Sequence, residues 1–206
     1  MGLVHHTATL DPTKQELVEA WLPSQPWASG REVTGKLGEY RFDDPDGEVG
    51  VETIVWTLDD GALAQTPLTY RAAPLDGGDA FLVGTTEHSV LGTRFVYDGA
   101  GDPIWAACLA TAILTGGTQA QMYVERDGER VDVPARIQVR GSGAAPFGHV
   151  ATPIDSVSTE DGVTTVHTGG LALALPRLVG SSVVGDATLA WVDRDGLTLA
   201  ALRRDA

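Results

Sequence analysis

The chain contains no asparagine, a single cysteine (Cys108) and only two lysines (Lys14 and Lys36). One cysteine excludes an internal disulfide and a zinc site with several cysteine ligands, and the apolar residues around Cys108 predict a small buried side chain. Kinase-type phosphoryl transfer uses an asparagine downstream of the catalytic aspartate to hold a metal ion, so that apparatus cannot be complete here. The nucleotide-binding loop G-x-x-x-x-G-K-[ST], the metalloprotease motif H-E-x-x-H and the hydrolase motif G-x-S-x-G are absent too.

Basic side chains are scarce: 14 Lys and Arg stand against 28 Asp and Glu, which gives a formal net charge of -14. A surface this negative repels the phosphates of nucleic acids and of anionic lipids, so we expect neither a nucleic acid nor a membrane as partner. No apolar run approaches the roughly 18 residues that a membrane-spanning helix needs. The N-terminus also lacks a basic segment followed by an apolar one, so a secretory signal is not expected. These features predict a cytoplasmic protein.

Two segments have the residue spacing of helices. The first is expected over residues 12–22, with Asp11 as the N-cap and a proline at the first helical position. The second is expected over residues 103–115, after Asp102, and it ends at Gly116. It is apolar nearly all round, which predicts that it is buried against a sheet.

The remaining sequence is typical of short strands, in keeping with 25 glycines and 11 prolines. The strands expected in the first half are Leu37–Asp43, Val49–Leu58, Ala62–Ala72, Phe81–Thr86 and Thr93–Tyr97. Three hairpins are expected afterwards, around Asp127-Gly128, Asp161-Gly162 and Asp195-Gly196, and the first of them has strands at residues 122–125 and 131–139. We therefore predict an α+β fold, mostly antiparallel β-sheet with two main helices and a C-terminal half rich in β-hairpins. A boundary near residue 120 would give domains 1–120 and 121–206, and whether these share one core stays open.

Glu87, His88 and Asp98 are the candidate catalytic residues. A carboxylate beside an imidazole can fix its tautomer and raise its basicity, as a general base requires, and Asp98 could orient the pair. No nucleophile accompanies them in the sequence. The alternative, which we favour, is a buried hydrogen-bonded network that fixes a turn against the second helix.

Aromatic side chains are the candidate ligand-binding residues. Trp27, with Tyr40 or Tyr70, could form a platform on which a sugar stacks. The other four tryptophans lie at positions typical of a core. For Trp27, which follows a proline, packing onto the first helix is the alternative that we favour.

No metal or cofactor is expected from the remaining polar motifs. His5 and His6 are adjacent, so on a strand their side chains point to opposite faces and cannot readily chelate one ion. The acidic run at residues 43–48 lacks the ligand spacing of a calcium loop and indicates a hairpin turn. Residues 141–143 begin like a dinucleotide-binding loop, but Pro146 stands where the third glycine belongs, so a plain loop is expected.

Several blocks of the first half resemble the N-terminal cap domain of actinobacterial maltokinases and related aminosugar kinases. The blocks are residues 17–27, 50–54, 66–71, 82–85 and 96–103. Together they extend the resemblance over roughly residues 3–120. In full-length kinases of that family, the cap precedes an ATP-binding lobe and a catalytic lobe that phosphorylates maltose or an amino sugar with MgATP. The resemblance implies the cap fold here but no phosphoryl transfer, because the second half has no recognisable catalytic loop.

The sequence therefore predicts a non-catalytic, cap-like binding or regulatory protein. The resemblance implies a role in α-glucan, trehalose or maltose metabolism through a protein partner such as a sugar kinase or a glucan-metabolising enzyme. The alternatives are a sugar- or nucleotide-binding protein and an enzyme of unrecognised type that uses Glu87, His88 and Asp98. The oligomeric state stays open, as does the choice for residues 121–206 between a degenerate nucleotide-binding lobe and an unrelated β domain.

Overall fold

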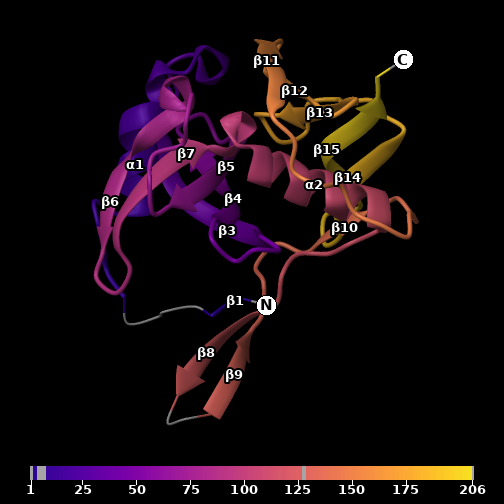
Figure 1. Cartoon of the computed structure of the whole chain (residues 1–206). Coiled ribbons are helices and arrows are strands. Elements are labelled where there is room, and N and C mark those ends of the chain that lie inside the picture. The colour runs from indigo at the N-terminus through magenta and orange to yellow at the C-terminus, as the bar shows by residue number, and fades with distance from the viewer. Residues whose placement is uncertain (1, 4–7, 127–128, 206) are drawn as a thin grey trace.

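The computed structural model describes residues 2–3, 8–126 and 129–205. Nearly half of this part of the chain lies in strands, almost all of them paired antiparallel, and it contains two α-helices (Figure 1). The first half comprises β1 (Gly2–Leu3), β2 (Leu10–Asp11), α1 (Lys14–Trp21), β3 (Val33–Asp43), β4 (Gly50–Leu58), β5 (Leu63–Arg71), β6 (Leu82–His88), β7 (Gly92–Asp98) and α2 (Pro103–Thr115). The second half comprises β8 (Met122–Arg126), β9 (Glu129–Val133), β10 (Val139–Gly141), β11 (Ile154–Glu160), β12 (Val163–Thr168), β13 (Leu171–Pro176), β14 (Ala187–Trp191) and β15 (Leu197–Arg204). Neither helix is long and apolar enough to cross a membrane within the described residues.

The first large sheet has the strand order β2-β6-β7-β5-β4-β3, and α1 packs on one of its faces. The expected start of α1 at residue 12 is wrong, because Thr13 and not Asp11 is its N-cap. The Thr13 hydroxyl accepts a hydrogen bond from the backbone N–H of Glu16, whose carboxylate accepts the N–H of Thr13 at 2.7 Å. This capping box satisfies two backbone donors at once, whereas Asp11 pairs with Glu87 in the sheet.

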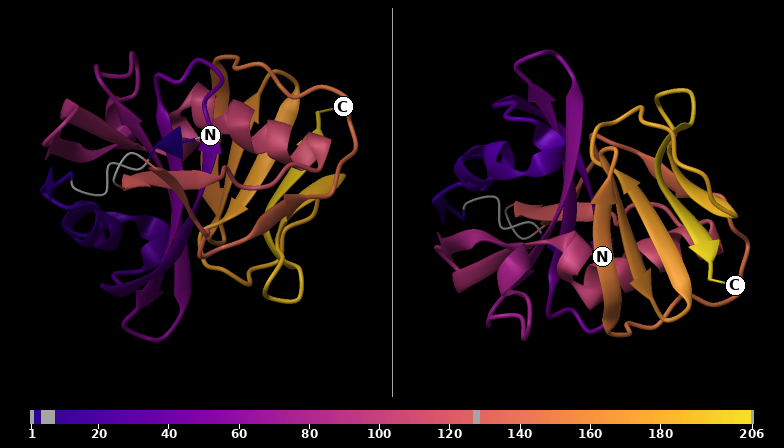
Figure 2. Two further views of the ribbon diagram at one scale, coloured as in Figure 1. Left: turned by 90° about the horizontal axis from the view of Figure 1, so that it is seen from below. Right: turned by 90° about the horizontal axis from the view of Figure 1, so that it is seen from above.

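Helix α2 begins and ends where the sequence predicts. Asp102 caps it by accepting the N–H of Ile104 at 2.9 Å, and Gly116 ends it in the left-handed conformation (φ 71°) that glycine adopts without strain. The helix contacts β3 and β4 of the first sheet and β10, β12, β14 and β15 of the second (Figure 2). It is thus buried between two sheets.

The second large sheet has the order β10-β14-β15-β13-β12-β11. It contains the expected β11–β12 and β14–β15 hairpins, whereas β13 was not predicted. The strand expected over residues 131–139 is wrong: β9 ends before Pro134, which cannot donate to a strand ladder, and β10 joins a different sheet. Strands β8 and β9 form a separate hairpin that projects from the body (Figure 1); its expected turn at residues 127–128 lies outside the described residues.

A single hydrophobic cluster contains side chains of both large sheets and of α2. Its members include Tyr40, Val51, Trp105, Leu109, Val166, Leu173 and Leu202. The two halves of the chain therefore share one core. A smaller cluster fills the space between α1 and the outer face of the first sheet.

The glycine-rich segment at residues 141–143 packs on the C-terminal end of α2; Gly141 is the last residue of β10, and the expected loop begins only at residue 142. The N–H of Gly143 donates to the carbonyl of Ile113 at 2.9 Å, which satisfies one of the helix's terminal acceptors. A Cβ on Gly141 would lie 1.9 Å from the carbonyl oxygen of Ala112. Only glycine permits this close approach of the two backbones.

Candidate functional site

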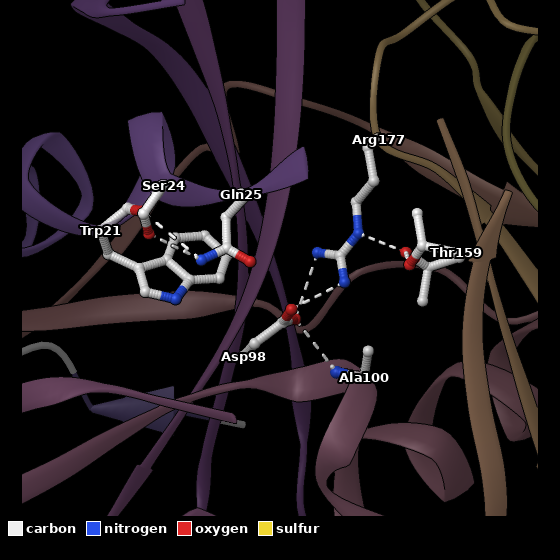
Figure 3. Close-up of polar contacts among 8 residues, drawn as sticks. Trp21, Ser24, Gln25, Asp98, Ala100, Thr159 and Arg177 are labelled. Carbon is white, nitrogen blue, oxygen red and sulfur yellow. Dashed lines mark hydrogen bonds and ion pairs between the residues drawn. The ribbon is translucent and has the colours of Figure 1, made fainter. Parts of the chain in front are cut away.

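Asp98 lies at the junction of the two halves, where it binds Arg177 (Figure 3). The guanidinium donates to both carboxylate oxygens, at 2.7 and 3.2 Å, and its Nε donates to the hydroxyl of Thr164 at 2.7 Å. Only 2% of the Arg177 surface is exposed, and the guanidinium lies 5.3 Å from the ring centre of Trp27. The carboxylate of Asp98 is thus committed to joining the halves.

Gln65, on β5, makes the second polar contact across this junction. Its side-chain amide donates to the carbonyls of Pro176 and Leu199, each at 2.7 Å, and its backbone N–H donates to Arg177. Sequence reasoning missed both Gln65 and Arg177. The available signal was Arg177 itself, because a charge directly after an apolar run needs a buried partner.

Glu87 and His88 do not meet Asp98. Both residues lie inside β6, not after it, and their side chains point to opposite faces of the strand. Glu87 pairs with Thr93, which precedes Asp98 on β7 by five residues, or about 17 Å of extended chain. The Thr93 hydroxyl donates to the carboxylate of Glu87 at 2.6 Å. The three candidate catalytic residues therefore form no shared site.

His88 instead orders the turn between β6 and β7. Its Nδ1 accepts the backbone N–H groups of Val90 and Leu91, each at 3.2 Å. An acceptor role for Nδ1 places the proton of a neutral imidazole on Nε2. The imidazole thus fixes a turn, as in the alternative that we favour, but the rest of that expectation is wrong: the hydrogen bonds are exposed, not buried, and the β6–β7 turn lies away from α2 (Figure 1).

His88 also borders a polar cavity of about 570 Å³ on the outer face of the first sheet. We call it the charged cavity, because it is lined by the cations Lys14, Arg41 and Arg94 and by the acidic residues Asp43, Asp44 and Glu48. Tyr70 and His88 are further polar residues of its lining. The Tyr70 hydroxyl donates to the buried carboxylate of Glu52 at 2.9 Å, and the Lys14 ammonium donates to the same carboxylate at 2.6 Å. Lys14 lies 5.0 Å from the ring centre of Tyr70.

The pKa of Glu52 reflects the charges around the base of the charged cavity. Burial on its own would raise the pKa of this carboxyl group, but the charges of Lys14 and Arg41 outweigh burial and lower the pKa to about 2. Burial and the carboxylate of Glu52 both raise the pKa of Tyr70, so its phenol keeps its proton. Positive charge thus prevails at the base of this cavity in an acidic protein.

A second cavity, of about 520 Å³, lies along one stripe of α2, and we call it the α2 groove. Its floor is formed by Ile104, Ala107, Cys108, Thr111 and Thr115, at helical spacing. One wall is the β3–β4 turn and the other is the segment 149–151. Cys108 is buried, as expected, and burial raises the pKa of its thiol to about 12.

The acidic run at residues 43–48 forms the β3–β4 turn, as expected. Asp44 holds this turn, because its carboxylate accepts the N–H groups of Glu48 and Val49 at 3.0 and 2.9 Å. Asp44 is buried, so the turn is only partly solvated.

Across the described ranges 2–3, 8–126 and 129–205, no group of three or more His, Cys, Asp and Glu residues could hold a metal ion. His5 and His6 lie outside the described residues.

The three candidate ligand-binding aromatics lie in three different places. Trp27 packs edge-on against Trp21 of α1, as favoured, and borders a third cavity of about 450 Å³ near the β11–β12 turn. Tyr40 is buried in the shared core, where burial raises the pKa of its phenol. Tyr70 borders the charged cavity. They do not form one sugar-stacking platform.

Residues 21–102 match the family model of the maltokinase N-terminal cap domain. The resemblance expected from the sequence is therefore confirmed, over a shorter range than residues 3–120. The matched segment covers β3 to β7 and ends at the N-cap of α2, so the second large sheet lies outside it. No curated protein matches the chain.

Proposed function

We propose that this chain is a non-catalytic binding or regulatory protein of the cytoplasm. It uses a maltokinase-type cap to associate with an enzyme of maltose, trehalose or α-glucan metabolism, such as a sugar kinase. The match of residues 21–102 to the cap domain carries this proposal. The separation of Glu87 and His88 from Asp98 supports a role without catalysis, because these three residues do not come together as an acid–base site.

The α2 groove is the surface that we assign to the partner. Its floor is apolar, and Phe147 and Val150, in the loop beside it, are 81% and 79% exposed. Exposed apolar side chains beside a groove are typical of protein interaction sites. Asp43 and Asp46 border the groove on the opposite side. The partner segment that fits this chemistry carries an apolar side chain followed by a lysine or an arginine.

An affinity experiment with the full chain tests the proposal. The wild-type protein is used as bait in an extract of the native host, and captured proteins are identified by mass spectrometry. We expect a sugar kinase or a glucan-active enzyme, and we expect Phe147→Asp to reduce its capture at least tenfold. Val184→Asp is the matched control, because Val184 is 90% exposed and does not border the groove. Failure to capture any enzyme of sugar metabolism would contradict the proposal.

The second candidate function is the binding of a small polar ligand, and the charged cavity favours it. Tyr70 offers a ring edge beside a carboxylate and three cations, as in sites for polar, hydroxylated compounds. Calorimetry with maltose, glucosamine and MgATP distinguishes sugar binding from nucleotide binding. Absence of heat with all three would leave the partner-binding function as the sole candidate of the two.

A further inference from the structure

We propose that the charged cavity binds the phosphate group of a small phosphorylated compound, with Arg41 and Arg94 as its principal ligands. The proposal concerns binding only and includes no chemical step. It goes beyond the partner-binding function and does not depend on it. Three cations border this cavity, two of them are arginines that form no ion pair in the described part of the chain, and a guanidinium group matches the geometry of a phosphate.

The three cations that border the charged cavity come from three separate elements. Arg41 lies opposite Glu52 in the β3–β4 ladder, and Tyr70 lies opposite Val96, two residues after Arg94 on β7. Two residues share one face of a sheet when they pair directly on neighbouring strands or when they lie two positions apart on one strand. Lys14 reaches the same space from the first turn of α1. Three of the protein's 14 basic side chains thus border one cavity, although the net charge is -14.

Two of these cations form no ion pair in the described part of the chain, although the charge of Arg41 also acts on the carboxylate of Glu52. Lys14 forms an ion pair with Glu52, whereas neither Arg41 nor Arg94 takes part in an ion pair there. Arg94 donates from Nη2 to the carbonyl of Leu91 at 2.8 Å, which leaves its charge uncompensated.

The acidic groups around the cavity do not neutralise the two arginines. Asp44 directs its carboxylate to backbone N–H groups of the turn, and Asp43 and Glu48 border the cavity from exposed positions. The low pKa of Glu52 follows from the nearby charges of Lys14 and Arg41, in keeping with positive charge at the base. His88 adds an imidazole at the opposite edge.

A phosphate monoester fits this arrangement in charge and in geometry. It carries a charge of about -1.5 to -2 at neutral pH, opposite in sign to the guanidinium groups of Arg41 and Arg94. Each guanidinium can donate two parallel hydrogen bonds to phosphate oxygens. The cavity volume of about 570 Å³ leaves room beyond the phosphate for a body of about the size of a sugar. Tyr70 and Leu10 border that space.

Calorimetry of the full chain with inorganic phosphate, glucose 6-phosphate, glucose and glucuronate tests the proposal. We expect binding of the two phosphates and no binding of glucose. Arg41→Gln and Arg94→Gln should each weaken the binding of glucose 6-phosphate at least tenfold, and Arg203→Gln, at an exposed position on β15, should leave it unchanged. Glucuronate separates the two anion classes: binding as tight as that of glucose 6-phosphate would overturn the assignment to phosphate.

A measurement on the wild-type chain covers the case in which a variant fails to fold. Because a ligand of the native state stabilises it, glucose 6-phosphate should raise the unfolding temperature more than sodium chloride at equal ionic strength. No rise up to a concentration of about 10 mM, together with no calorimetric signal, would overturn the proposal. This outcome would leave the partner-binding function untouched, since the isolated chain is measured without any partner.

Discussion

Arginines occupy two contrasting environments in this molecule. At the junction of the halves, Arg177 donates from Nε, Nη1 and Nη2 to Thr164 and Asp98, so its charge and its donors are satisfied. In the charged cavity, Arg41 and Arg94 face a cavity and form no ion pair in the described part of the chain. An arginine whose donors and charge are satisfied by protein groups, such as Arg177, fixes the fold. An arginine that borders a cavity without forming an ion pair is available to a ligand.

The largest effect on stability is expected for Arg177→Ala, which tests the role of the ion pair at the junction. The substitution leaves the carboxylate of Asp98 buried without its partner, and removal of one member of a buried ion pair costs about 3–5 kcal/mol. Denaturant unfolding measures the change, with Arg203→Ala as the exposed control, for which we expect less than about 0.5 kcal/mol. A loss below about 1 kcal/mol for Arg177→Ala would show that the junction does not depend on this pair.

The second prediction concerns the charged cavity and the dependence of stability on pH. The pKa of Glu52 is lowered from 4.5 to about 2, so ionised Glu52 stabilises the fold above pH 4.5, and this contribution is lost as the pH falls toward 2. We therefore expect the wild-type protein to lose more unfolding free energy between pH 5 and pH 2 than Glu52→Gln does. Glu160→Gln, at an exposed site, should follow the wild type. Parallel pH profiles for the wild type and Glu52→Gln would contradict the positive potential at the base of the cavity.

Gly141→Ala changes no charge, and it tests whether the junction also depends on the close packing of the two backbones. Gly141→Ala would place a Cβ 1.9 Å from the carbonyl oxygen of Ala112, so loop and helix must separate, at a cost of about 1–3 kcal/mol. Gly35→Ala is the matched control, because nothing lies within 4 Å of its Cβ position. Thermal unfolding of both variants measures the difference. Equal unfolding temperatures would mean that the loop adjusts at no cost.

The smallest expected effect concerns a contact that lies entirely within the cap-like sheet and its helix. Thr13→Ala removes the hydroxyl that accepts the N–H of Glu16, and loss of such an N-cap costs about 1 kcal/mol. Ser158→Ala, at an exposed strand position, should change the unfolding free energy by less than about 0.5 kcal/mol. If Thr13→Ala destabilised the protein as much as Arg177→Ala, the ranking of the two regions would be wrong.

Local signals in the sequence predicted one part of this structure well. The bounds of α2 follow from Asp102 and Gly116, which act within one helical turn, and turn dipeptides located the β11–β12 and β14–β15 hairpins. Strand β13 was missed because its alternating Leu and Ala are apolar on both faces, so no polar face marked it.

The candidate sites were harder to predict because their members are distant in the sequence. Arg177 lies 79 residues from Asp98, and no local pattern joins them. Glu87 and His88 suggested a catalytic pair because they are adjacent in the chain, yet adjacency on a strand separates side chains. The cations of the charged cavity come from α1, β3 and β7, and only the sheet brings them together.

The distance of 79 residues between Asp98 and Arg177 also has a consequence for biosynthesis. At the usual rates of translation, the ribosome needs about 4 to 16 s to add that many residues. During this interval the cap-like sheet is complete in sequence, but Asp98 and Gln65 have not yet met their partners. We therefore expect the sheet to mature only after β13 has left the ribosome, late in the synthesis of the chain.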